Sequence, residues 1–72
     1  MPPELLSALE ALPHDYRVAV LLRDVEQLTY DEMSLALNVP IGTVRSRIAR
    51  GRSRLLALLS TAGAADEVAA PE

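Results

Sequence analysis

The stretch from Thr29 to Pro40 constrains this chain more than any other part of it, because it marks both ends of one short helix. Thr29 and Glu32 have the spacing of a capping box, in which each side chain accepts a hydrogen bond from the other residue's backbone amide. Asn38 tolerates the left-handed conformation that often ends a helix, and Pro40 stops any continuation. The pattern predicts a helix over residues 30–37, followed by a tight turn and a new helix.

The remaining helices are predicted from the prolines and from the spacing of apolar residues. A first helix is expected from about Pro3 to Ala11. A second is expected after Pro13, with Asp15 in its first turn, and should run to about Glu26. The leucines expected on one stripe of the first helix are Leu5, Leu6, Leu9 and Leu12.

The last helix is expected to begin at Pro40 or Ile41 and to end near Leu59. At about 100° per residue, one stripe of this helix is apolar and is predicted to be core. It consists of Val44, Ile48, Gly51, Leu55 and Leu58. Beyond Ser60 large apolar residues are scarce, which predicts a domain over residues 1–60 and a disordered acidic tail over residues 61–72.

Composition favours a small helical domain. The chain has 72 residues, no cysteine, and two tyrosines as its only aromatic residues, so the core is aliphatic and no disulfide holds it. We expect an all-α domain of four helices with a C-terminal helix-turn-helix and no wing. No apolar run of about 18 residues is present and the first residues are not basic, so neither a membrane span nor a secretory signal is expected. The predicted setting is cytoplasmic.

Positive charge is concentrated in a short part of the chain. All seven basic residues are arginines, and five of them lie within residues 45–54, where no acid is present. The net charge is −5 in residues 1–44, +5 in residues 45–54 and −3 in residues 55–72. Because surface charges are screened over about 8–10 Å, a ligand near this helix is attracted by the local cluster of arginines more than it is affected by the net charge of the chain. The cluster predicts an anion-binding surface on the last helix.

The arginines flank a ridge of small residues opposite the apolar stripe. The ridge consists of Ser46, Ala49 and Ser53, with Arg45 and Arg52 on one side and Arg47, Arg50 and Arg54 on the other. Small side chains permit close approach to a DNA groove, and guanidinium forks pair with guanine or phosphate. An ordinary solvated face is less favoured, because none of the five arginines has an acid three or four positions away. Membrane binding is disfavoured, because the apolar stripe has no Trp or Phe.

The order of these helices predicts a helix-turn-helix. A capped helix, a short turn and an amphipathic helix with polar residues at its beginning are the parts of that motif. In it the second helix enters the major groove with its N-terminal end, while the first helix crosses the DNA backbone. Thr29 and Tyr30 are therefore candidate donors to phosphate, although capping by itself explains Thr29.

Two segments resemble region 4 of bacterial sigma factors. The first is Val20-Leu21-Leu22-Arg23-Asp24-Val25-Glu26 together with Leu28-Thr29-Tyr30-Asp31-Glu32-Met33. The second is Leu37-Asn38-Val39-Pro40-Ile41-Gly42-Thr43-Val44-Arg45-Ser46-Arg47-Ile48-Ala49-Arg50-Gly51-Arg52. This second segment is similar to the extracytoplasmic-function (ECF) group, and its Pro-x-Gly-Thr-Val-Arg-Ser-Arg string is highly specific. The resemblance covers about residues 8–58.

The resemblance implies that the domain recognises the −35 promoter element in double-stranded DNA, docks on the flap of the RNA polymerase β subunit and directs transcription initiation. The residues that it places against the duplex are Gly42, Thr43, Arg45, Ser46 and Arg50. Arg45 and Arg50 are the candidates for base edges. The residues assigned to phosphates or to the flap side are Arg47, Arg52 and Arg54. ECF sigma factors also have a region 2, which reads the −10 element and has no counterpart in this sequence.

Other function classes stay open at this stage. Region 4 of the ECF group is often bound by an anti-sigma factor, so the domain can instead be chiefly a protein-interaction module. An exposed apolar patch would favour that interpretation, and the residues concerned are Leu22, Val25, Leu55 and Leu59. A helix-turn-helix of the response-regulator type would form dimers. We expect no catalysis, cofactor or metal, because His14 is the only histidine and no phosphate-binding loop or ligand cluster is present.

Overall fold

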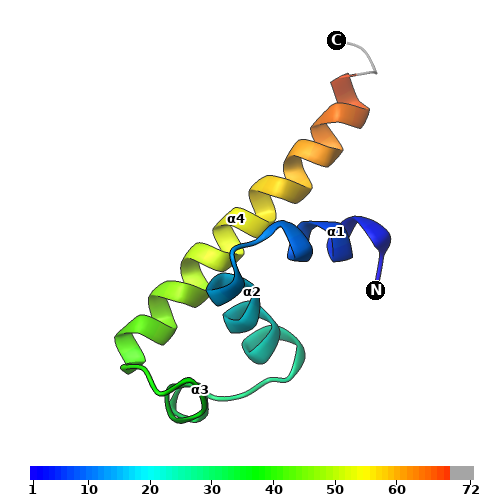
Figure 1. Ribbon diagram of the computed structural model, residues 1–72. Coiled ribbons are helices and arrows are strands. Elements are labelled where there is room, and N and C mark those ends of the chain that lie inside the picture. Colours follow the sequence, from blue (N-terminus) through cyan, green and yellow to red (C-terminus); the bar gives the residue numbers. More distant parts are fainter. Residues whose placement is uncertain (69–72) are drawn as a thin grey trace.

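The computed structural model describes the backbone of residues 1–68 and the side chains of residues 1–60. Its elements are α1 (Pro3–Ala11), α2 (His14–Val20), the π-helical segment η1 (Leu21–Val25), α3 (Tyr30–Leu37) and α4 (Ile41–Val68) (Figure 1). No strand occurs among these residues, so the prediction of an all-α domain of four helices without a wing is confirmed. None of the described helices is long and apolar enough to cross a membrane.

The second helix changes its winding halfway along. α2 begins at His14, directly after Pro13, and passes without a break into η1. The Glu26 amide closes η1 with a hydrogen bond of 3.0 Å to the Leu21 carbonyl. Gln27 then adopts a left-handed conformation (φ 63°), which ends the helix and leads the chain towards α3. The predicted end near Glu26 is confirmed, whereas the π-helical winding was not predicted.

The capping box at the beginning of α3 is formed as predicted. The Thr29 hydroxyl oxygen accepts a hydrogen bond from the Glu32 amide at 3.0 Å, and the Glu32 carboxylate accepts one from the Thr29 amide at 2.7 Å. At the other end Asn38 is left-handed (φ 57°, ψ 48°), and the Val39 amide donates to the Ser34 carbonyl at 3.2 Å. Local bonds therefore hold both ends of α3.

Two groups of buried side chains form the core. The group between α2, α3 and α4 consists of Ala19, Met33, Val44 and Ile48. The group between α1 and α2 consists of Leu9, Leu12 and Val20. Leu58, which was predicted to be core, is 37% exposed, and Leu6, which was placed on the apolar stripe of the first helix, is 48% exposed. In Figure 1 only α1 lies beside the part of α4 that follows its crossing with α2. One short helix covers too little surface to bury both leucines, so the prediction for Leu58 is wrong.

Gly51 allows α2 and α4 to cross closely. The glycine is buried, and a Cβ atom at this position would lie 2.7 Å from Cγ2 of Val20 and 3.0 Å from the carbonyl oxygen of Tyr16. Both distances are shorter than ordinary van der Waals contact, and closely packed interiors transmit such strain. A larger residue at position 51 would therefore push the two helices apart.

The last helix is longer than predicted. Its predicted end near Leu59 is wrong, because the helical backbone of α4 continues to Val68. The added segment is rich in alanine, which has the highest helix propensity of all residues, and this explains a helix without many large apolar side chains. The predicted acidic tail over residues 61–72 therefore begins within a helix, and residues 69–72 lie outside the described part of the chain. The domain boundary at residue 60 stays a prediction.

Candidate nucleic-acid interface

The two last helices and the turn between them form the predicted helix-turn-helix. Met33 of α3 is buried in one group with Val44 and Ile48 of α4, so the two helices pack directly against each other. The turn consists of residues 38–40. Its Pro40 carbonyl accepts hydrogen bonds from the amides of Thr43 and Val44, at 2.9 and 3.2 Å. This packing holds the N-terminal end of α4 in place beside α3.

The first turns of α4 present the predicted DNA-facing residues to solvent. Gly42, Arg45 and Arg50 are exposed, and Thr43 and Ser46 are half-buried. The Ser46 hydroxyl donates to the Thr43 carbonyl at 3.2 Å, one turn earlier in the same helix. A Cβ atom at Gly42 would have no atom within 4 Å, so there is open space beside the helix at this point. A large ligand can therefore approach this end of α4.

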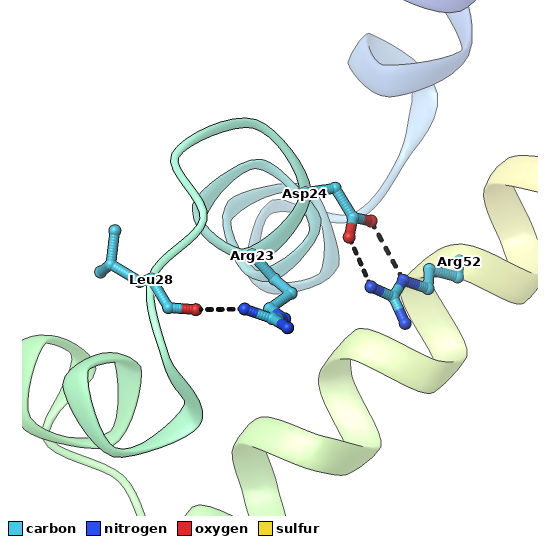
Figure 2. Close-up of polar contacts among 4 residues, drawn as sticks. All are labelled: Arg23, Asp24, Leu28 and Arg52. Atoms are coloured by element: carbon cyan, nitrogen blue, oxygen red, sulfur yellow. Dashed lines mark hydrogen bonds and ion pairs between the residues drawn. The ribbon is translucent and has the colours of Figure 1, made fainter.

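Tyr30 brings together two arginines from different elements. The centre of its ring lies 6.0 Å from the guanidinium carbon of Arg45 and 5.5 Å from that of Arg23, within the range of cation–π contacts. The ring is half-buried against the core, so it is a fixed support for both side chains. Arg23 was not among the predicted site residues. It reaches Tyr30 because of the turn after η1, where its Nη1 donates to the Leu28 carbonyl at 2.9 Å (Figure 2).

Arg52 forms an ion pair with Asp24 across the molecule. Its Nε donates to one oxygen of the Asp24 carboxylate at 3.0 Å, and its Nη2 donates to the other oxygen. Figure 2 shows the two groups facing each other between η1 and α4. The hydrogen bonds from Arg52 hold the pKa of Asp24 below its usual value, and those to Asp24 raise the pKa of Arg52. Both groups are therefore charged at neutral pH.

Two further arginines of α4 contact α2. Nη2 of Arg47 lies 3.7 Å from a carboxylate oxygen of Asp15, and the guanidinium of Arg54 lies 5.5 Å from the centre of the Tyr16 ring. Among the described side chains, none of these arginines pairs with an acid of α4, but acids of α2 and η1 reach two of them through the fold. Among the described side chains, the arginines of α4 that have no acidic partner are Arg45, Arg50 and Arg54.

The predicted site is thus divided into two parts. Thr29 and Tyr30 lie at the beginning of α3, where the Tyr30 ring is close to Arg45 at the beginning of α4. Arg52 and Arg54 lie farther along α4, beside η1 and α2. In the part of the chain that the structure describes, no three His, Asp or Glu side chains come together in a way that could hold a metal ion. The contacts of these residues with DNA stay predictions.

Comparison with known proteins identifies similar chains. Residues 3–55 match the family model described as Sigma-70, region 4. The chain is 52% identical over 52 residues to the ECF RNA polymerase sigma factor SigE of Mycolicibacterium smegmatis, a match that covers 72% of this chain and 20% of that protein. It is 45% identical over 47 residues to the ECF RNA polymerase sigma-E factors of Escherichia coli and Salmonella typhimurium, covering 65% of this chain and 25% of each relative. The matched part therefore spans a quarter or less of the length of these relatives.

Proposed function

The chain belongs to the sigma-70 region 4 family, and from this premise we propose that it reads the −35 promoter element and docks on RNA polymerase as part of an ECF sigma factor. The observation that supports this most is the exposed N-terminal end of α4, where Arg45 and Arg50 stand free of acidic partners among the described side chains. The helix-turn-helix packing holds this end in the position that the motif uses in the major groove. The protein would act in the bacterial cytoplasm, where promoters and polymerase meet.

We assign the base edges of the −35 duplex to Arg45 and Arg50, because guanidinium forks make bidentate contacts with guanine in the major groove. Gly42, Thr43 and Ser46 are small, and they allow the duplex to approach the backbone of α4 closely. The Tyr30 ring limits the freedom of the Arg45 side chain, which lowers the entropy lost when that side chain binds a base.

The phosphates of the duplex would be bound by groups around this centre. These are Thr29, Tyr30, Arg23, Arg47 and Arg54. Phosphate contacts fix the register and orientation of a protein on DNA, whereas base contacts provide the sequence preference. Arg47 contributes less than the others, because its guanidinium lies close to the Asp15 carboxylate.

The protein partners that we propose are the flap of the RNA polymerase β subunit and an anti-sigma factor. Three exposed leucines lie on α1 and on the later part of α4, away from the N-terminal end of α4, and they are Leu6, Leu56 and Leu58. A protein bound there would leave the DNA-reading end free. A fourth exposed leucine, Leu35, lies on α3. A chiefly protein-binding module would be favoured by an exposed patch of Leu22, Val25, Leu55 and Leu59. Val25 is 55% exposed, whereas the three leucines are half-buried.

Two arginine variants test the assignment of bases and phosphates. Arg45→Ala should weaken binding to the matching −35 duplex by about 1–3 kcal/mol and relax the preference at one base pair, whereas Arg54→Ala should weaken binding to every duplex about equally. Fluorescence anisotropy with a matching and a scrambled duplex measures both effects. Equal losses on both duplexes for Arg45→Ala would remove this residue from base reading. A stable dimer at micromolar concentration would instead favour the response-regulator type of domain.

A further inference from the structure

Asp24 forms an ion pair with Arg52, an arginine that would otherwise extend the DNA-binding surface. Arg45 and Arg52 are seven residues apart, which is about two helical turns, so both lie on one side of α4 about 10 Å from each other. With a free guanidinium, Arg52 would continue the positive surface that begins at Arg45. The Asp24 carboxylate accepts hydrogen bonds from two nitrogens of Arg52 (Figure 2). A bidentate contact of this kind is also what arginine offers to a phosphate.

The ion pair affects the charge of the surface more than the stability of the fold. The side chains of Arg52 and Asp24 are 46% and 38% exposed, and exposed ion pairs contribute little to folding. The five arginines of residues 45–54 have no acid beside them in sequence. Asp24 therefore cancels one positive charge of this surface from a different element of the fold.

On the basis of the proposed DNA-binding function, we propose that Asp24 is a specificity-determining residue, which keeps Arg52 away from the DNA phosphates. A phosphate contact adds affinity for every duplex alike, because the DNA backbone carries no direct sequence information. Asp24 limits this sequence-independent affinity by binding Arg52. Discrimination between promoters is then left to the arginines at the beginning of α4.

The salt dependence of binding tests this role, because each phosphate that a protein neutralises steepens the plot of log affinity against log salt by about 0.9. Asp24→Asn keeps the shape of the side chain and releases Arg52, so the slope should steepen by about 0.9. Over a tenfold change in salt concentration, the affinity of this variant should then change about eightfold more than that of the wild type. Binding to a scrambled duplex at low salt should become tighter. Arg52→Gln should leave the slope of the wild-type protein unchanged, and Asp24→Asn with Arg52→Gln should restore the wild-type slope.

Glu26→Gln is the matched control, because it removes the same charge two residues away. Glu26 is exposed and has no ion pair among the described side chains, so its replacement should leave the slope unchanged. The inference is overturned if Glu26→Gln has the same effect as Asp24→Asn, if Asp24→Asn leaves the slope unchanged, or if Arg52→Gln by itself reduces the slope by about 0.9. If the wild-type protein binds neither duplex at any salt concentration, the proposed function fails as well.

Discussion

Replacing Gly51 by alanine should destabilise the domain, although alanine is the better helix former. In an exposed position of a helix, this change stabilises by about 1 kcal/mol. At Gly51 the new methyl group would lie 2.7 Å from Cγ2 of Val20 and 3.0 Å from the carbonyl oxygen of Tyr16. Neither atom can move easily, because Val20 is β-branched and buried and the Tyr16 oxygen belongs to the backbone of α2.

The expected loss of stability in Gly51→Ala follows from two opposing effects, the overpacking of the core and the gain in helix propensity. Overpacking a close-packed core costs typically about 1–3 kcal/mol, and the upper part of that range applies because the atoms in the way are held rigidly. After subtracting the gain in helix propensity, we expect a net loss of about 1–2 kcal/mol. For a domain of this size, that corresponds to a melting temperature about 5–15 °C lower.

Thermal unfolding followed by circular dichroism at 222 nm measures this loss, and Gly42→Ala is the matched control. A Cβ atom at Gly42 has no neighbour within 4 Å, so the same substitution there should raise the melting temperature slightly. The two substitutions in one helix should therefore have opposite signs. A Gly51→Ala protein as stable as the wild type, or more stable, would refute the close crossing of α2 and α4.

The remaining predictions concern the cap of α3 and the stability of the fold at low pH. Thr29→Ala removes the hydroxyl of the capping box and should cost about 1 kcal/mol in urea unfolding, whereas Thr29→Ser should cost less; equal losses would show that the cap hydrogen bond is not the cause. The pKa of Asp24 is lowered from its usual 3.8, so the stability from its pair with Arg52 is present above that value and lost as the pH falls through the lowered pKa. The difference in unfolding free energy between wild type and Asp24→Asn should therefore be small at neutral pH, because the pair is exposed, and should shrink further below about pH 4. A difference that stays constant down to acid pH would contradict this.

The ends of α3 could be predicted from the sequence because the bonds that form them join near neighbours. Thr29 and Glu32 are three residues apart, and the helix stops at Asn38, whose left-handed conformation depends on its own side chain. The position of Gly51 on the buried stripe followed from helical periodicity in the same way. Such features need no knowledge of the tertiary fold.

The contacts of the arginines could not be predicted, because they depend on how distant segments pack. Asp24 and Arg52 are 28 residues apart, and they meet only because α2 crosses α4 and continues into η1. Arg23 reaches Tyr30 through the same unexpected segment. The exposure of Leu58 likewise depends on how little of α4 is covered by α1. Sequence periodicity predicts a face of a helix, but not which neighbour covers it.

The most direct test of the account is a map of the DNA-binding surface by nuclear magnetic resonance. Amide signals of the labelled protein would be followed during titration with a −35 duplex. We expect the largest changes in residues 41–50 and at Thr29 and Tyr30, with residues of α1 unaffected. Changes concentrated instead on α1 and around Leu58 would contradict the central claim that the N-terminal end of α4 reads the duplex.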